Sequence, residues 1–313
     1  MLCNKMKSLF IVLMLFLLPI SAEAATCFWV GGVGTWSTAN AASWSSSTGG
    51  AGSTCAATGG IPKQAADTAT FDGASGGGTV TVDTTINGVT LTQITMGAFT
   101  GTLDFSINNP SVTMAVMSIS GAGTRTVKLG SGTFTLTSNN TSNMFDASTI
   151  TGLTLTAGTS TINFAPSSAP NGSWGLASGG LNGANALNNV TFTFGSSSAV
   201  RNAFITGSNT INVLTVGANV ALQPNSNTTQ ILTSLIIGGT SSLQTMLGGA
   251  ASTPAIISIA TGTINLSWAG IRAVTFTGGA TFIAANSFDL GNNSGITITG
   301  PAGGAGGGHI IGG

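Results

Sequence analysis

Most of this chain consists of short runs in which apolar and small polar residues alternate. Examples are "TVTVD" from Thr79, "TFTLTS" from Thr133 and "VTFTF" from Val190. A period of two places apolar side chains on one face of a β-strand and polar ones on the other. The runs are rich in Thr and Val and are separated by Gly and Asn, which favour turns. No helical periodicity follows the first two dozen residues, so an all-β fold is predicted.

A longer pattern recurs within these runs: an apolar residue, two residues, an apolar residue, one residue, and a third apolar residue. The interval between successive copies varies and is shortest from Ile211 to Leu232 and longest from Leu232 to Ile271. Such self-similarity is typical of stacked coils, none of which can bury its apolar stripe alone. The copies are Ile86/Val89/Leu91, Met114/Met117/Ile119, Ile150/Leu153/Leu155, Leu187/Val190/Phe192, Ile211/Leu214/Val216, Leu232/Leu235/Ile237 and Ile271/Val274/Phe276.

The repeat predicts a single-stranded parallel β-solenoid (β-helix) over residues 79–299, with roughly ten turns. Tandem β-sandwiches are the alternative, because they also produce regular short strands with turns between them. The solenoid is favoured since each copy starts with the same pattern. Sandwich strands would also be expected to carry more charge on their solvent faces.

The two ends of the chain differ from this body. Residues 1–24 read as a signal peptide: Lys5 and Lys7 precede the apolar run "LFIVLMLFLLPI", and "AEA" (residues 22–24) matches a cleavage site after Ala24. A membrane anchor is the alternative, but twelve apolar residues are too few to span a bilayer. Residues 300–313, "GPAGGAGGGHIIGG", form a Gly-rich, low-complexity tail.

Residues 25–78 are predicted to form an N-terminal cap. An open solenoid end exposes an unpaired strand edge, which something must cover. Trp29, Trp36 and Trp44 lie in "CFWVGGVGTWSTANAASW", and they are expected to be buried there rather than displayed for binding. Cys27 and Cys55 remain after signal removal and predict a disulfide, worth roughly 3 kcal/mol in the chain-entropy model, with two unpaired thiols as the alternative.

Composition narrows the range of partners. Only 4% of the chain is charged, and 42% is hydrophobic, so the chain is expected to be ordered despite its low charge. Signal removal takes Lys5, Lys7 and Glu23 from seven basic and seven acidic residues, which leaves five basic and six acidic and a net charge of −1. No basic face for nucleic acid is therefore expected.

The candidate chemistry is sparse. Asp83, Asp104, Arg125 and Asp146 are evenly spaced along the sequence, so coils of that one constant length would stack them in a line. That line would suit a carbohydrate-active β-helix enzyme of the polysaccharide lyase or hydrolase type. The repeat intervals are not constant, so the preferred interpretation is a non-catalytic protein with isolated acids at turns. His309 lies alone in the tail, which leaves no Ser/His/Asp arrangement.

Neither a metal nor a cofactor is expected. Zinc lacks ligands, and "FDGASGGG" from Phe71 is one imperfect copy of a calcium-binding repeat, read instead as a Gly-rich loop. Threonine pairs such as Thr135/Thr137 could form a regular ice-binding array, but they are interpreted as ordinary exposed strand residues because they keep no single place in the repeat. Trp174 and Trp268 could stack on sugar rings, and burial is favoured for both.

The two ends resemble a known group. A signal peptide followed by "FWVGGVGTWSTANAASW" and "DTATFDG" resembles the start of secreted β-solenoid proteins, which include autotransporter-type passengers and adhesins and phage-encoded structural or tail-associated proteins. The segment Gly278–Thr299 is similar to the end of many such chains, where an aromatic residue often stands in place of Ile296. These motifs mark an architecture and transfer no catalytic residues.

The resemblance implies surface adhesion or structural display. The expected role is a non-catalytic, secreted structural or adhesin-like protein, at a bacterial surface or on a phage particle. Such a protein would present a rigid, uncharged surface to a glycan or protein. A homo-oligomer is compatible with this, and no transmembrane segment is expected after signal removal.

Overall fold

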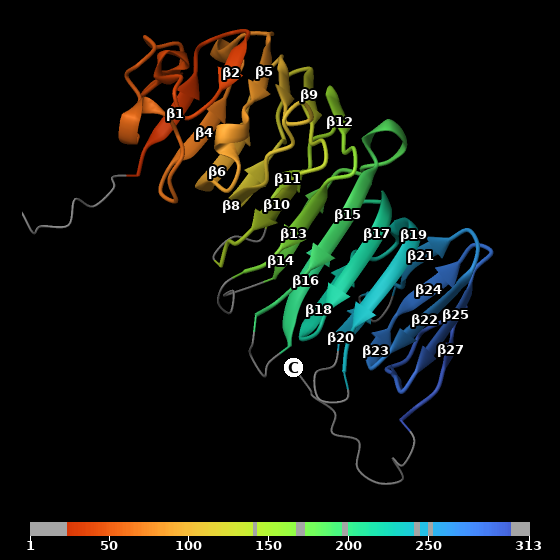
Figure 1. The fold of residues 1–313 in the computed structure, drawn as a ribbon. Coiled ribbons are helices and arrows are strands. Elements are labelled where there is room, and N and C mark those ends of the chain that lie inside the picture. The colour runs from red at the N-terminus through yellow and green to blue at the C-terminus, as the bar shows by residue number, and fades with distance from the viewer. Residues whose placement is uncertain are drawn as a thin grey trace, which may run out of the picture.

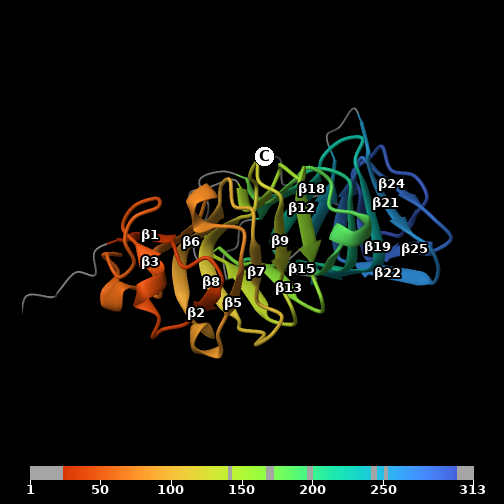
Figure 2. The same ribbon diagram turned by 90° about the horizontal axis from the view of Figure 1, so that it is seen from above.

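A computed structural model describes residues 24–139, 143–166, 173–195, 200–240, 245–249 and 253–301. Residues 1–23 of the predicted signal peptide lie outside the described residues, as do residues 302–313 of the Gly-rich tail with His309. The described chain is a parallel β-solenoid, as predicted. Its strands stack side by side in chain order, from the N-terminal end in red to the C-terminal end in blue (Figures 1 and 2).

Four ladders of parallel strands run along the solenoid. The longest passes through nearly every coil and contains eleven described strands. Its strands are β1 (Thr26–Trp29), β4 (Thr68–Phe71), β6 (Thr90–Met96), β8 (Val112–Ser118), β10 (Thr133–Leu136), β13 (Thr161–Phe164), β15 (Leu187–Phe192), β17 (Asn209–Gly217), β19 (Thr229–Gly238), β21 (Ala255–Ile259) and β24 (Val274–Thr277). We call it the first ladder.

The second ladder starts from the far end of β8 and continues to the C-terminal coils. Its further strands are β11 (Asn143–Ala147), β14 (Trp174–Ser178), β16 (Arg201–Ile205), β18 (Val220–Pro224), β20 (Thr245–Gly248), β23 (Ala269–Arg272) and β26 (Phe288–Asp289).

Two shorter ladders provide a further side of the coils, one in the N-terminal half of the solenoid and one at its C-terminal end. The third ladder, in the N-terminal half, holds β2 (Gly34–Trp36), β5 (Thr79–Val82), β7 (Thr102–Asp104), β9 (Arg125–Lys128) and β12 (Leu153–Thr156). The fourth, at the C-terminal end, holds β22 (Thr263–Ser267), β25 (Thr281–Ala285) and β27 (Thr297–Ile298).

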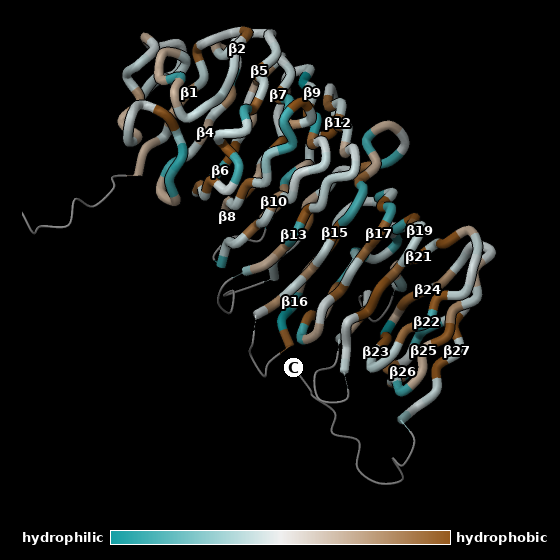
Figure 3. The backbone as a smooth tube through the Cα atoms, viewed as in Figure 1, coloured by the Kyte–Doolittle hydropathy of each residue, from teal (hydrophilic) through white to brown (hydrophobic). Residues whose placement is uncertain are grey.

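Alternation within each strand builds the core. Apolar residues point inward and stack in columns from coil to coil, while their polar neighbours point out. The alternation of hydrophobic and hydrophilic residues along the backbone can be followed in Figure 3. One inward column, entirely buried, passes along the first ladder through Leu91, Met114, Leu136, Phe164, Phe192 and Val216. The rings of Phe164 and Phe192 are stacked in it with centroids 4.5 Å apart. Parallel pairing throughout these ladders rules out the β-sandwiches.

The predicted repeat is correct in the middle of the chain and shifted elsewhere. The copies starting at Leu187, Ile211 and Leu232 pair position for position. Met114, however, pairs with Leu91 and not with Ile86. The copy starting at Ile150 lies largely in β12, on the third ladder, and the copy starting at Ile271 is divided between β23 and β24. Alternating Thr/Val runs fit one pattern in several registers, and the coil length varies, so sequence spacing could not select the right register.

Tight corners separate the strands. The backbone of Gly130 and Gly158 is left-handed, with φ of 72° and 59°. A side chain on Gly158 would collide with the carbonyl of Gly130 on the preceding coil, so this corner requires glycine. The helical elements of the described chain are five single 3₁₀ turns: η1 (Ala41–Ser43), η2 (Thr58–Gly60), η3 (Gly73–Ser75), η4 (Thr84–Ile86) and η5 (Gly183–Asn185).

Stacking begins earlier than the predicted boundary at residue 79. β1 pairs with β4 in parallel, and β2 pairs with β5, so the first coil lies within the stretch assigned to the cap. The cap proper is the long insertion between β2 and β4, which includes β3 (Trp44–Ser45). β3 lies antiparallel on the outer edge of β1 and covers the strand edge that the solenoid would otherwise leave open.

Candidate functional site

The three cap tryptophans form a buried cluster. Trp29, Trp36 and Trp44 are fully buried, as predicted, and all three rings pack against Phe71 of the next coil. Trp29 and Trp44 meet edge to face, with centroids 5.2 Å apart. The aromatic stretch therefore closes the solenoid and offers no indole ring to a ligand.

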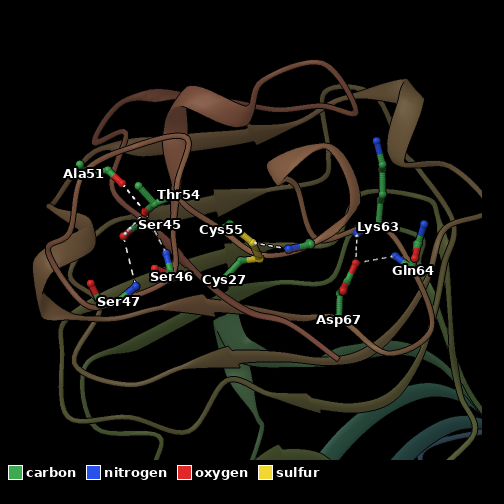
Figure 4. The surroundings of a disulfide bond; sticks show 11 residues. Cys27, Ser45, Ser46, Ser47, Ala51, Thr54, Cys55, Lys63, Gln64 and Asp67 are labelled. Atoms are coloured by element: carbon green, nitrogen blue, oxygen red, sulfur yellow. Dashed lines mark hydrogen bonds between the residues drawn. A yellow bond between two sulfur atoms is a disulfide. The ribbon is translucent and has the colours of Figure 1, made fainter. Parts of the chain in front are cut away.

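The predicted disulfide joins Cys27 of β1 to Cys55 of the insertion, with Cα atoms 5.3 Å apart (Figure 4). Asp67 lies in the chain that leads from the insertion back into the stack. Its carboxylate accepts hydrogen bonds from the amides of Lys63 and Gln64, at 3.1 and 3.0 Å. The bridge and this turn fix the insertion against the first coil.

The predicted line of Asp83, Asp104, Arg125 and Asp146 does not form. Asp104 of β7 stands opposite Thr81 and Lys128, while Asp146 belongs to the second ladder and stands opposite Ser118 and Ala177. The coil from β7 to β9 is longer than the interval from Asp104 to Arg125, because Asp104 pairs with Lys128 at the other end of β9. Even spacing along the chain therefore cannot keep these residues in one column.

The carboxylate of each of the three candidate acids, Asp83, Asp104 and Asp146, accepts hydrogen bonds from residues close to it in the structure. Asp83 caps η4 and accepts from the Thr85 amide at 2.9 Å, and hydrogen bonds from Thr85 hold the pKa of its carboxyl below the ordinary value of 3.8. Asp146 accepts from the amide and hydroxyl of Ser148, at 3.0 and 2.7 Å. Two of these carboxylates therefore satisfy the amides of turns.

Asp104 forms the salt bridge of the third ladder, with its Oδ2 3.1 Å from Lys128 Nζ. Burial by itself raises the pKa of the Asp104 carboxyl, but hydrogen bonds from Ser106 and Lys128 and the charge of Lys128 outweigh burial and lower the pKa. The carboxylate is thus stabilised in its ionised form.

Arg125 is buried and is a structural residue. Its Nε donates to the Ile119 carbonyl at 2.6 Å, and its Nη atoms donate to the carbonyls of Gly121, Gly123, Thr149 and Thr151 at 2.5–3.3 Å. Desolvation lowers the pKa of this guanidinium. It ties together two neighbouring turns, and its donors are used within the protein.

The loop that resembles a calcium-binding repeat is a capped turn. Asp72 accepts from the amides of Ala74 and Ser75, at 2.9 and 3.1 Å, and from the hydroxyl of Thr48. The described residues contain no group of three or more His, Cys, Asp or Glu side chains that could hold a metal ion. Of the two distant tryptophans, Trp174 is fully buried, as expected, and Trp268 is half-buried.

The outward face of the first ladder carries the most regular polar surface. One outward column passes from β6 to β19 through Thr90, Thr113, Thr135, Asn163, Thr191, Thr215 and Ile236. A second passes from β10 to β19 through Thr133, Thr161, Asn189, Val213 and Ser234. No described strand of this ladder between β6 and β19 contains a charged residue. We call this surface the threonine face.

The third ladder also stacks threonines, contrary to the expectation that these pairs keep no common place. Thr79, Thr102, Thr126 and Thr154 form one column. The neighbouring column is Thr35, Thr81, Asp104, Lys128 and Thr156, so the salt bridge interrupts the hydroxyls. An alignment of the repeat on apolar residues alone does not reveal these registers, because the lengths of the corners between strands differ from coil to coil.

A polar hollow lies on the second ladder, at a place that the sequence pattern does not indicate. It has a volume of about 290 Å³ and is lined by Phe204, Gln223, Pro224, Asn225, Ser226, Gly249 and Arg272. These residues come from β16, β18, β23 and the turns that follow β18 and β20. Only the pairing of strands far apart in the chain brings them together.

Comparison of the sequence with protein-family models, with curated proteins and with solved structures gives no match. The described chain contains no helix that is long and apolar enough to cross a membrane. The class is therefore defined by the fold itself: a parallel β-solenoid with a disulfide-linked, tryptophan-filled cap at its N-terminal end.

Proposed function

We propose that this chain is a non-catalytic, extracellular β-solenoid that binds a glycan along its threonine face, at a bacterial surface or on a phage particle. The observation that supports this most is the long run of hydroxyl and amide side chains from β6 to β19, without a charge among them. Parallel strands repeat about every 4.8 Å, so these groups form a rigid array for the hydroxyls of an extended polysaccharide.

A glycan suits this face better than a protein does. Protein interfaces usually need a fully buried apolar or aromatic centre. The threonine face offers Ile231 and Ile236 as its exposed large apolar side chains, both at the β19 end. The disulfide is compatible with an extracellular location, since such bonds persist in oxidising compartments.

The proposal is tested by glycan-array binding of the purified protein and of two double variants, each checked for an unchanged fold by circular dichroism. Thr135→Lys/Thr191→Lys places two charges on the threonine face, and Thr79→Lys/Thr154→Lys places two on the third ladder. We expect at least about a tenfold loss of affinity in the first variant and little change in the second.

Three results would overturn the proposal. They are equal loss in both variants, binding to a protein but to no glycan, and release of new sugar ends from a polysaccharide. If Asp104→Asn or Asp146→Asn abolished the release of sugar ends, the carbohydrate-active enzyme would be established instead.

A further inference from the structure

The hollow lies where a glycine, Gly248, interrupts an outward column of larger side chains on the second ladder. Phe204 stands opposite Gln223, and Gly248 stands opposite Arg272. β18 and β20 pair through Ala221–Met246 and Leu222–Leu247, and continuing this register by one residue places Gln223 opposite Gly248. The outward column is therefore Phe204, Gln223, Gly248 and Arg272. Gln223 and Arg272 are two rungs, or about 10 Å, apart, with a slot between them.

Glycine keeps this slot open. A Cβ atom on Gly248 would lie 2.9 Å from the Arg272 carbonyl, and one on Gly249 would lie 2.8 Å from the Ala273 carbonyl. Both approaches are to the backbone of the next coil, which cannot easily move aside. The turn after β18, with Asn225 and Ser226, forms the rim.

The polar side chains around the slot have no partner within the described chain. The side chains of Gln223, Asn225, Ser226 and Arg272 take part in no hydrogen bond or ion pair with the described residues. Elsewhere, amides are used to join coils: Asn209 donates to Gln230 at 3.0 Å, for example. Two amides, a hydroxyl and a guanidinium thus face one hollow with their hydrogen-bonding capacity free.

Arg272 is one of two cations after residue 24 whose side chains have no partner among the described residues. Five Lys or Arg residues follow residue 24. Arg125 is buried, Lys128 pairs with Asp104, and Arg201 is half-buried with its guanidinium 6.0 Å from the Phe194 ring centroid. Of the remaining two, Lys63 belongs to the cap, and Arg272 lines the hollow. Asp289 of the next coil is bound to Gly291 and Asn293 at 2.9 and 2.7 Å.

We infer that this hollow binds an acidic sugar unit, a hexuronate, within a longer glycan. The Arg272 guanidinium supplies a planar pair of donors for the carboxylate. Gln223, Asn225 and Ser226 bind ring hydroxyls, and the Phe204 ring packs against the apolar face of the pyranose. A volume near 290 Å³ is at the lower end of ligand sites, which suits one sugar unit rather than a whole oligosaccharide. The inference adds a second glycan site to the threonine face, and it rests on the proposed function for the choice of a sugar.

The test compares a short oligoglucuronate with the same oligosaccharide after its carboxyl groups are reduced to alcohols, by calorimetry on the full chain. We expect the acidic form to bind at least about tenfold more tightly, and Arg272→Gln to abolish that difference. Phe204→Ala should weaken both forms. Lys63→Gln removes a cation of the cap, far from the hollow, and should change neither.

Equal binding of the two forms, or an acidic preference that survives Arg272→Gln, would overturn the inference. Binding of neutral glycans that Thr135→Lys/Thr191→Lys weakens, with no binding of the oligoglucuronate, would overturn the acidic site alone and leave the proposed function standing. Failure of every glycan in both experiments would overturn both.

Discussion

At the scale of single residues, Arg125 shows how a charge can be buried without a carboxylate. Five backbone carbonyls, from the turns at residues 119–123 and 149–151, surround its guanidinium. Carbonyls at a turn between two coils have no strand partner, and an unpaired buried polar group is costly. Arg125 satisfies several of them at once.

Replacing Arg125 with Met should lower the free energy of unfolding by about 2–4 kcal/mol, because the carbonyls lose charged donors at a buried position. The free energy of unfolding of Arg125→Lys should fall between those of the wild type and Arg125→Met, since an ammonium has three donors and no planar fork. Denaturant unfolding measures both changes, and hydrogen exchange should locate them at residues 119–125 and 149–152. A change below about 0.5 kcal/mol in Arg125→Met would contradict this role.

At the scale of elements, strand pairing decides which side chains can act together. The Asp104–Lys128 bridge joins β7 to β9 across one rung of the third ladder. Its position interrupts an otherwise uncharged column of threonines. The first ladder has no such pair between β6 and β19 in its described strands, which is why it presents the longer uncharged surface.

The lowered pKa of Asp104 predicts a pH dependence of stability. A carboxyl whose folded pKa is depressed stabilises the fold above its unfolded pKa, near 3.8, and loses that contribution as pH falls through the folded pKa. The stability difference between wild type and Asp104→Asn should therefore be largest near neutral pH and shrink below about pH 4. Lys128→Met keeps the Ser106 hydrogen bonds and should retain part of the dependence. Denaturant midpoints across this pH range measure it, and a constant difference would refute the assignment.

At the scale of the whole molecule, each coil contacts mainly its neighbours, so stability is a sum of local terms along the solenoid. The aromatic cluster and disulfide strengthen only the N-terminal coils. β3 pairs with Phe28 and Trp29 of β1 and so hinders addition of another strand along that part of the edge.

Cys27→Ser/Cys55→Ser should therefore act locally. The chain-entropy model gives a loss of roughly 3 kcal/mol for a bridge of this span. Hydrogen exchange should become faster in β1, β3 and β4 and stay unchanged in β21–β25, because distant coils share no contacts with the cap. Faster exchange along the whole solenoid would show that the coils unfold as one unit and would disprove the local account.

The sequence by itself determined the fold class, the disulfide and the buried cap. Period-two alternation does not depend on register, so it indicates strands wherever they pair. Leu187, Ile211 and Leu232 align correctly because their coils follow at short intervals without large insertions. The two cysteines that follow the predicted signal peptide allow one intramolecular bridge, and bulky aromatics in a chain of small residues are most stable when buried.

Register was decided only by the tertiary structure. A small change in coil length moves a side chain to another column, so even spacing in the sequence could not stack Asp104 with Asp83, Arg125 or Asp146. The same variation hid the threonine columns and the hollow, whose Phe204 and Arg272 lie far apart in the chain and several coils from each other. Which residues share a surface depends on the summed lengths of the corners between them, and those lengths are set by packing of one coil on the next.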